Sequence, residues 1–580
     1  MADKDVVTTR GADELRAARA ESRMLYISVA VFSFFVNALM LTGPLYMLNV
    51  YDRVLGSRSF ETLLALSGLV AFLFLMMGIL DVVRGRIMGR VGARFQARLD
   101  RRVFAAAVRG TSSGQAGREA QTAQRDLEAL QRLIASPALM AAFDLPFAPL
   151  FFAGIFLFHP WLGLLALGGA AVLIALAVAN QFLSRRPLER MNAATQRSET
   201  MGGQIRSESE MVLALGMQDA AFARWQQARD AALGESLSAS ETSGGFNGVI
   251  KAARLFLQSA MLGLGAYLVL QNQLSPGAMI AGSILLGRAL APIEMIVGQS
   301  ALFQRAREGW RNLAVLLGTI PEREGRTALP RPQARLSVEQ ATVALPGEQV
   351  ATLRMLSFQV QPGQAVGVIG PSGCGKSTLA KTLTGLLRPA AGKVRLDGAA
   401  LDQYDEDVLG RYIGYLPQRV GLFDGTIKDN IARLSPEPDD AAVVLAAKRA
   451  GAHEMILKLP DGYDTRVTAQ GGRLSGGQVQ RIGLARAMYG DPVMLVLDEP
   501  NSNLDNAGSE ALNGAIKAFK DAGRIVLIMA HRPAAIQECD MLLVIENGVR
   551  RAFGPKDEVL RDTVKNHGEI RAPGARGGVS

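Results

Sequence analysis

The chain has 580 residues, of which 49% are hydrophobic and 20% charged, and its formal net charge is +10. This length suffices for two or more domains, and the mixture of apolar and charged residues indicates a membrane part joined to a soluble part. The two cysteines, Cys374 and Cys539, and four scattered histidines disfavour a disulfide framework and a structural zinc site.

Residues 1–23 are polar, and we expect them to form a short cytosolic N-terminal segment. Six apolar segments of about twenty residues follow, and this is the length that crosses a bilayer. A transmembrane domain is therefore predicted over residues 24–318. Its spans are expected near residues 24–46, 60–82, 137–158, 161–183, 247–271 and 277–299.

Long polar stretches separate the second span from the third and the fourth from the fifth. The first stretch is dense in arginine from Arg84 to Arg109, and the second begins with Arg185 and Arg186. By the positive-inside rule, both stretches and both termini are cytosolic. Orientation in the membrane thus explains most of the positive charge, which disfavours DNA binding. Residues that favour helices dominate both polar stretches. This composition predicts that each stretch forms a long cytosolic helical hairpin.

Charged residues are few within the predicted spans, and Asp144, Arg288 and Glu294 are among them. An ionisable group in the middle of a membrane costs roughly 2.5–3.5 kcal/mol on insertion scales, so each should face a partner or a polar pathway. One interpretation is a structural ion pair between Asp144 and Arg288. The other is a direct role along the path of the substrate.

Proline and polar residues mark a change in the chain after the last span, which predicts a linker followed by a soluble domain. Residues 336–343 and 356–360 are expected to form antiparallel strands joined through Pro346 and Gly347. The tail, rich in Gly and Arg, is predicted to be disordered. The predicted boundaries are 319–335 for the linker, 336–565 for the soluble domain and 566–580 for the tail.

A glycine-rich segment between a predicted strand at 365–369 and a predicted helix matches the phosphate-binding pattern G-x-x-x-x-G-K-[ST]. Glycines let backbone N–H groups and the positive end of the helix approach a phosphate closely. We expect Lys376 to reach the β- and γ-phosphates of ATP and Ser377 to hold Mg²⁺. The predicted phosphate-binding residues are Gly370, Pro371, Ser372, Gly373, Cys374, Gly375, Lys376, Ser377 and Thr378.

Further motifs follow the phosphate loop. They include Gln418, the segment Leu474–Gln478, the carboxylates Asp498 and Glu499 after the apolar run 493–497, Asp505, and His531 after the predicted strand 524–530. In this order they match the Q-loop, the signature, the metal-binding and catalytic carboxylates, the D-loop and the switch histidine of ABC transporter ATPases, which this domain therefore resembles.

Each of these residue types has a chemical reason, because phosphoryl transfer depends on positioning and charge neutralisation. Asp498 is expected to hold Mg²⁺, through water, at the tip of its strand. Gln418 would contact the metal and the γ-phosphate. Glu499 would orient or deprotonate the attacking water, and His531 would hydrogen-bond the γ-phosphate.

Ser475, Gly477 and Gln478 open a helix whose N-terminus can bind an anion. In the proteins that this chain resembles, this helix faces the ATP held by the phosphate loop of another copy. One chain carries one of each motif, so two complete sites imply a homodimer of half-transporters, with Asp505 also at the nucleotide. Leu345 stands where ABC ATPases usually stack an aromatic residue on adenine, which puts base selectivity in doubt.

The membrane half resembles the transmembrane domain of ABC exporters. This resemblance implies an α-helical six-span exporter domain fused to an α/β P-loop ATPase domain, with the second coupling helix near residues 207–217. The segments Thr42–Leu55, Asp144–Pro146 and Pro500–Asp505 resemble the type I secretion ATPases of Gram-negative bacteria, most of all the protease-exporter branch.

That resemblance implies a multi-pass protein of the bacterial inner membrane, with a cytoplasmic ATPase, that exports an unfolded polypeptide bearing a C-terminal secretion signal. The implied partners are a periplasmic membrane-fusion adaptor and a TolC-like outer-membrane channel. Exporters that cleave a leader carry an N-terminal peptidase domain, whereas about 23 residues precede the first span here. We therefore expect the secreted protein to be delivered uncut.

Three other functions compete with secretion. A lipid or drug exporter of the same architecture is the nearest alternative, and it would need neither adaptor nor channel. A non-transporting ABC ATPase acting on DNA or ribosomes is disfavoured by the six spans. An ABC importer is disfavoured because importers usually keep permease and ATPase on separate chains.

Overall fold

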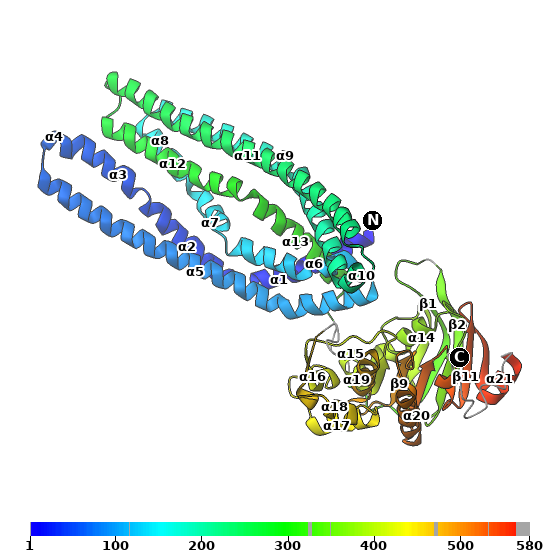
Figure 1. The fold of residues 1–580 in the computed structure, drawn as a ribbon. Coiled ribbons are helices and arrows are strands. Elements are labelled where there is room, and N and C mark those ends of the chain that lie inside the picture. The colour runs from blue at the N-terminus through cyan, green and yellow to red at the C-terminus, as the bar shows by residue number, and fades with distance from the viewer. Residues whose placement is uncertain are drawn as a thin grey trace. The chain divides into compact units, whose positions relative to one another are not determined.

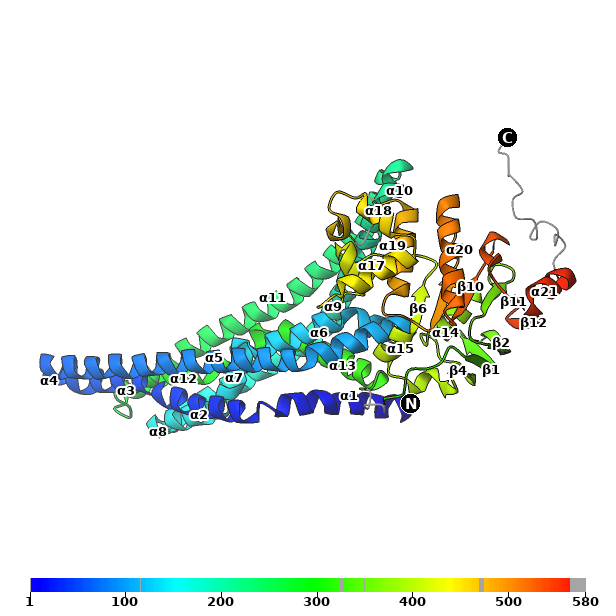
Figure 2. The same ribbon diagram turned by 90° about the horizontal axis from the view of Figure 1, so that it is seen from below.

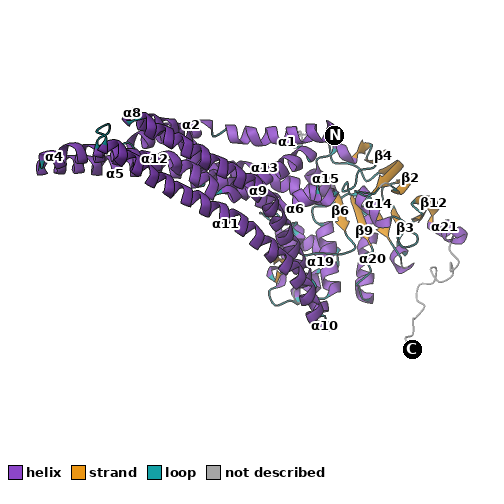
Figure 3. Ribbon diagram, turned by 90° about the horizontal axis from the view of Figure 1, so that it is seen from above, coloured by secondary structure: helices purple, strands orange, loops and turns teal. Residues whose placement is uncertain are grey.

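The computed structural model describes residues 2–114, 116–322, 328–348, 350–468, 474–531 and 533–563. The chain divides into two compact units, with the main division between residues 322 and 323, inside the predicted linker. The first unit is helical, and the strands of the described residues gather in the second (Figure 3). Residues 323–327 of the linker, residues 564 and 565 and the tail 566–580 lie outside the described residues.

Six helical segments of the first unit are long and apolar enough to cross a membrane, which confirms the six predicted spans. Three of them, α5, α9 and α11, have 54, 48 and 53 residues and continue well beyond their apolar part, so the two predicted helical hairpins are also present (Figure 1). The helices are α1 (Ala2–Ala20), α2 (Arg23–Leu39), α3 (Thr42–Asn49), a π-helical turn (Val50–Val54), α4 (Leu55–Ser57), α5 (Phe60–Ser113), α6 (Gly117–Ile134), α7 (Pro137–Asp144), a 3₁₀ turn (Leu145–Phe147), α8 (Ala148–Phe158), α9 (Pro160–Ser207), α10 (Ser209–Ala214), α11 (Gln218–Leu270), α12 (Pro276–Gly298) and α13 (Ser300–Thr319).

The helices of this unit bury two separate apolar cores. One lies among the spans and includes Phe151, Leu162 and Met261. The other lies where α1, α5, α6 and α13 pack together, and includes Leu15 and Leu313. The short helix α10 falls within residues 207–217, where the coupling helix is expected, and its coupling role stays a prediction.

Asp144 lies at the end of α7, where the third span leaves the α-helical path through a 3₁₀ turn that contains Pro146. Proline cannot donate the next helical hydrogen bond, which explains the break. The Asp144 carboxylate accepts two hydrogen bonds from the guanidinium of Arg84 on α5, at 2.6 and 3.1 Å. Asn37 of α2 donates a third hydrogen bond to it, at 2.8 Å.

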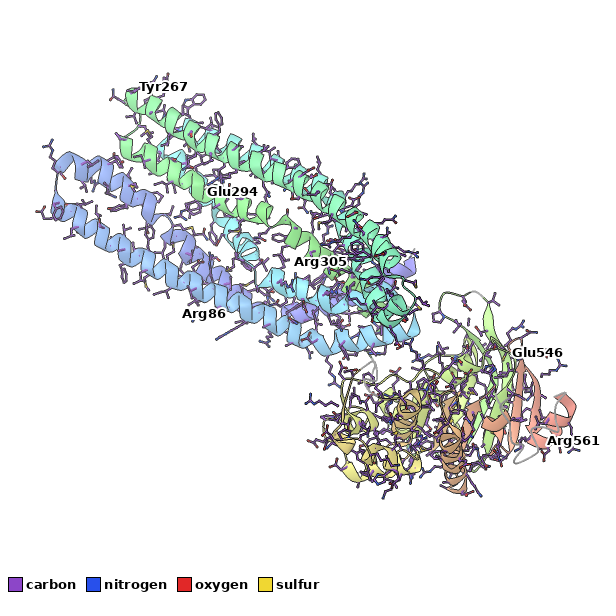
Figure 4. All side chains as sticks on the ribbon, in the orientation of Figure 1. Arg86, Tyr267, Glu294, Arg305, Glu546 and Arg561 are labelled. Atoms are coloured by element: carbon purple, nitrogen blue, oxygen red, sulfur yellow. The ribbon has the colours of Figure 1, made fainter. Side chains whose placement is uncertain are left out.

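The predicted pairing of Asp144 with Arg288 is therefore wrong. Arg288 is exposed on α12, whereas Asp144 faces α2 and α5. Glu294 of α12, labelled in Figure 4, pairs instead with Arg254 of α11 at 2.7 Å. Both membrane carboxylates thus have structural partners, as the ion-pair interpretation requires, but the partner of Asp144 is Arg84 and not Arg288.

The second unit is built on a six-stranded sheet in the order β12-β11-β3-β10-β9-β6, with the strands from β11 to β6 parallel. A four-stranded antiparallel sheet, in the order β2-β1-β4-β5, lies in the same unit. The strands are β1 (Leu336–Ala344), β2 (Ala351–Val360), β3 (Ala365–Ile369), β4 (Ala391–Leu396), β5 (Ala399–Ala400), β6 (Ile413–Leu416), β7 (Gly425–Thr426), β8 (Arg466–Val467), β9 (Met494–Asp498), β10 (Ile525–Met529), β11 (Met541–Glu546) and β12 (Val549–Pro555).

The predicted antiparallel pair at the start of this unit is confirmed as β1 and β2, although β2 begins at Ala351, five residues earlier than expected. β9 and β10 are buried along their whole length, as their continuous apolar runs require for central parallel strands. The helices are α14 (Lys376–Leu383), α15 (Glu406–Tyr412), α16 (Ile427–Ile431), α17 (Asp440–Arg449), α18 (His453–Leu457), α19 (Gly476–Met488), α20 (Asn506–Asp521) and α21 (Lys556–Thr563).

Asp491, in the turn between α19 and β9, joins three distant parts of this unit. Its carboxylate pairs with three arginines that precede β1, end α17 and precede β10. Burial acts to raise the pKa of Asp491, but hydrogen bonds from the arginines outweigh it and lower the pKa to about 2. The arginine before β1 is Arg331, at 2.9 Å; the one at the end of α17 is Arg449, at 3.1 Å; and the one before β10 is Arg524, at 2.5 Å.

Candidate nucleotide site

The predicted phosphate loop lies between β3 and α14, at the carboxyl end of the parallel sheet. Gly375 has a φ of +104°, and a Cβ there would lie 2.6 Å from a methyl carbon of Leu353. At Gly370 a Cβ would lie 2.1 Å from the carbonyl oxygen of Ile545. Both positions therefore favour glycine. Because these residues have no side chain, the loop backbone at the start of α14 is left uncovered.

Lys376 begins α14 and is only 5% exposed. Its ammonium group donates hydrogen bonds to the carbonyl oxygens of Gly370 and Pro371, at 2.8 and 2.9 Å, so it lies over the loop. Cys374 is buried beneath the loop, whereas Ser372 and Gly373 form its exposed tip. Thr378 is buried in the first turn of α14.

Asp498 ends the buried strand β9 and is 2% exposed. Its pKa is raised by burial, against a hydrogen bond from Ser377 that lowers it, and the charge of Glu499 raises it further. One carboxylate oxygen, Oδ1, is buried without a hydrogen-bond partner among the described residues. A buried hydroxyl–carboxylate pair with a free oxygen is a donor set that fits a hard divalent cation such as Mg²⁺.

Glu499 and His531 meet because they follow neighbouring parallel strands, β9 and β10, in which Asp498 lies opposite Met529. The Nε2 atom of His531 lies 3.1 Å from Oε1 of Glu499. Glu499 has a left-handed φ of 51°, and its N–H donates to the carbonyl oxygen of Met529. This backbone turn directs the carboxylate towards the histidine rather than along the strand.

Gln418 follows β6, the strand on the other side of β9, and therefore belongs to the same carboxyl edge. It is exposed, and its amide makes no hydrogen bond to Asp498 or Glu499 among the residues that the structure describes. Leu345 follows β1, is half-buried, and packs on the apolar core that also contains Cys374. In the part of the chain that the structure describes, Gln418 is thus near the carboxylates without a hydrogen bond to them, and Leu345 makes an apolar contact with the core that contains Cys374.

The signature residues begin α19. Ser475 caps this helix by accepting from the N–H of Gln478 at 3.3 Å, and the Gln478 side chain accepts from the N–H of Ser475 at 2.8 Å. Gly477 lies against Asn503, since a Cβ there would be 2.9 Å from the Asn503 carbonyl oxygen. The signature and the D-loop are therefore neighbours within one chain.

Asp505 begins α20 as its cap, accepting from the N–H of Gly508 at 2.7 Å and from the guanidinium of Arg481 at 2.9 Å. The hydrogen bond from Gly508 is the main reason that the pKa of Asp505 is lowered. Sequence reasoning missed Arg481, and also Gln480, whose buried amide donates to the carbonyl oxygen of Pro500 at 3.0 Å. Both partners are at least twenty residues away in sequence, so no local pattern marks them.

Comparison with known proteins agrees with this architecture. Residues 26–290 match the family described as the ABC transporter transmembrane region, and residues 353–502 match the family described as ABC transporter. The chain is 40% identical, over 96% of its length and 95% of the relative's, to the Type I secretion system ATP-binding protein PrsD of Rhizobium meliloti (strain 1021). The chain belongs to the ABC transporter family of type I secretion ATP-binding proteins.

One further relative and one solved structure agree with this architecture. The Toxin RTX-I translocation ATP-binding protein of Actinobacillus pleuropneumoniae is 29% identical over 93% of the transporter and 77% of the relative. A solved structure of a bacterial Atm1-family ABC exporter with ATP bound shares the fold, with a TM-score of 0.79 and 22% identity, over 96% of the transporter and 100% of that chain. The transporter is thus a multi-pass membrane protein that couples ATP hydrolysis to transport.

Proposed function

We propose that the transporter exports an unfolded polypeptide that carries a C-terminal secretion signal, as the motor of a type I secretion system. The observation that carries this proposal is the 40% identity with a type I secretion ATP-binding protein over almost the whole of both chains. This resemblance extends through the spans, along which the proposed cargo would pass, and is not confined to the ATPase, which all ABC proteins share.

We infer that the ATPase is cytoplasmic and that the spans lie in the bacterial inner membrane. The basic residues of α5 beyond its apolar part support this orientation. The proposed partners are a periplasmic membrane-fusion adaptor, a TolC-like outer-membrane channel and the secreted protein itself. The names of the relatives, which refer to type I secretion and toxin translocation, support these partners.

In the proposed nucleotide site, Lys376 and the backbone N–H groups of the loop neutralise the charge of the phosphates. Ser377 and Asp498 would hold Mg²⁺, which supplies positive charge beside the transferred phosphoryl group when bound. The buried Oδ1 of Asp498 supports this assignment, because an unpaired carboxylate oxygen inside a protein needs a cation or a donor.

Glu499 is the proposed general base, and its carboxylate accepts a proton from water at Oε1 or Oε2. His531 lies within hydrogen-bond distance of Oε1 and would both orient that carboxylate and contact the γ-phosphate. Gln418, at the neighbouring strand end, would reach the same region from an exposed position. These roles use groups that the sheet already brings to one edge.

We further propose that the functional unit is a homodimer. Ser475, Gly477 and Gln478 form the N-terminus of α19, where the helix dipole and the N–H groups that the cap does not use favour an anion. In the proposed dimer this terminus and Asp505 complete the site on the phosphate loop of the partner chain. Each chain would then contribute one half to each of two sites.

The experiment that tests this function is secretion in cells. A strain lacking the transporter should accumulate its cargo in the cytoplasm, and the same accumulation is expected when the adaptor or the outer-membrane channel is deleted instead. The Glu499→Gln variant should fail to restore secretion although it inserts in the membrane. Export that persists without adaptor and channel would favour the lipid or drug exporter.

A further inference from the structure

The N-terminal helix α1 packs with α5, α6 and α13 at the end of the bundle where the chain leaves the membrane unit (Figure 2). Its buried positions recur every three or four residues, which is the pattern of a helix with one covered face. Leu15 is fully buried within the core that also holds Phe95 of α5 and Leu317 of α13. The helix is therefore part of the folded unit and more than a lead-in to the first span.

Two glycines bring α1 and α13 into backbone contact. A Cβ at Gly11 would lie 2.0 Å from the carbonyl oxygen of Ala314, and a Cβ at Gly318 would lie 1.9 Å from that of Val7. No side chain fits at either position. The two helices run antiparallel at this contact, so the start of α1 covers the last turn of α13.

Arg102 of α5 joins the three helices. Its side chain is 9% exposed, and its Nε atom lies 2.7 Å from a carboxylate oxygen of Glu14 on α1. The same guanidinium donates to the carbonyl oxygen of Ile320 at 2.7 Å, just after α13 ends. The last carbonyl groups of a helix have no partner within it, and a cation there is favoured by the helix dipole. Arg102 thus fixes the end of α13 to α1 and α5 together.

The other side of α13 is fixed to α6. Asp126 of α6 is fully buried and pairs with Arg305 of α13 at 2.8 Å, and Asn312 donates a further hydrogen bond to it at 3.0 Å. Figure 4 labels Arg305. Between α12 and α13 the helical path is interrupted at Gln299, with φ −108° and ψ 20°. The position of α13 therefore depends on its packing partners and not only on continuity with the last span.

We propose that α1 is a positioning element of the transport cycle, in which Glu14 and Arg102 fix the last turn of α13 to α5. The chain continues into the ATPase unit directly after this turn. A movement of the ATPase that is transmitted through the connecting chain therefore reaches the membrane unit at the end of α13. With the turn fixed, the displacement moves α5 and α13 as one body and reaches the spans. When the last turn of α13 is not fixed, the same movement displaces only that turn and does not reach the spans, although ATP is still hydrolysed.

The inference concerns coupling and is independent of which cargo is exported, so its test uses no cargo. The full-length transporter in lipid nanodiscs is compared with and without ATP and vanadate, and amide hydrogen exchange is followed in peptides from α12 and α13. ATP hydrolysis is measured in parallel. The variants are Arg102→Gln and Gly11→Leu, with Arg101→Gln as the matched control because Arg101 is the exposed neighbour on the same helix.

In the wild type and in Arg101→Gln, nucleotide is expected to change exchange in α12. In Arg102→Gln and Gly11→Leu, exchange at residues 313–320 should rise about tenfold, and the nucleotide-dependent change in α12 should fall at least threefold. ATP hydrolysis should stay within about twofold of the wild type, which a general loss of folding would not allow.

If either of the two clamp variants, Arg102→Gln and Gly11→Leu, does not fold, Glu14→Gln provides the milder test, since it removes one charge and leaves the contacts of Arg102 with α13 in place. A nucleotide-dependent change in α12 that is as large in the clamp variants as in the wild type would overturn the proposal. So would a wild type without any such change, or a parallel loss of ATP hydrolysis in every clamp variant.

Discussion

The buried pair of Arg84 and Asp144 offers the sharpest test of how the membrane unit is held together. Arg84 is 5% exposed, and its two terminal guanidinium nitrogens donate one hydrogen bond to each carboxylate oxygen of Asp144. In Asp144→Leu, the guanidinium keeps only Asp81, whose side chain is 56% exposed, and a hydroxyl contact to Ser33 at 3.1 Å. The variant thus removes the buried partner of a buried cation and leaves it a carboxylate that is more than half exposed.

Removing one partner of a buried ion pair typically costs about 3–5 kcal/mol, because the remaining charge stays desolvated. Replacing both partners by apolar side chains of similar size is often close to neutral. We therefore expect Asp144→Leu to lower the free energy of unfolding by about 3–5 kcal/mol, and the double variant with Arg84→Met to recover most of that loss. Asp144→Asn keeps one oxygen acceptor, so its free energy of unfolding should lie between those of Asp144→Leu and the double variant.

The assay is equilibrium unfolding of the detergent-solubilised transporter by sodium dodecyl sulfate, followed by circular dichroism. Arg288→Gln serves as the control, since Arg288 is exposed on α12 and should change the unfolding midpoint little. If Asp144→Leu and the double variant were equally destabilised, or if Arg288→Gln were as costly as Asp144→Leu, the reasoning about this pair would be refuted.

The remaining predictions concern the ATPase unit. Because hydrogen bonds from three arginines hold the pKa of Asp491 at about 2, against 3.8, its carboxylate stabilises the unit above about pH 4 and loses that effect between about pH 4 and pH 2. Asp491→Asn should cost about 1 kcal/mol after solvent screening, and thermal unfolding at pH 7 and at pH 3 should show the difference shrinking. Asp498→Asn should raise the Mg²⁺ concentration for half-maximal ATP hydrolysis at least about tenfold, and an unchanged requirement in a magnesium titration would contradict the metal assignment. Glu499→Gln should slow ATP hydrolysis by about 10²–10⁴-fold while a fluorescent ATP analogue still binds, and simultaneous loss of binding would show that the residue has another role. Gly375→Ala should abolish that binding because residues with a side chain rarely adopt its φ of +104° and its Cβ would also lie 2.6 Å from a methyl group of Leu353; normal affinity would show that the loop can shift.

Much of the architecture could be predicted because it depends on local patterns. The spans follow from the length of apolar runs, and β3, β9 and β10 follow from short apolar runs that end in functional residues. The meeting of Glu499 and His531 is also predictable, since both directly follow strands of the same parallel sheet. In these cases chain order and hydrogen-bond geometry fix the positions together.

What could not be predicted depends on how helices are rotated about their own axes. Asp144 and Arg84 are sixty residues apart, and the sequence does not say which face of each span meets the other. The sequence offers Arg288 as a partner for Asp144, but the rotation of α12 about its axis places Arg288 on the exposed side. The same holds for α1, whose contact with α13 depends on two glycines more than three hundred residues apart.

The measurement that tests the central claim most directly is the ATPase rate of the purified transporter in lipid, with and without peptides from the C-termini of secreted proteins encoded nearby. The Glu499→Gln variant provides the blank. We expect a cognate peptide, but not a scrambled one, to change turnover in the wild type and to do nothing in the blank. Indifference to every such peptide together with strong stimulation by lipids or drugs would contradict the secretion function.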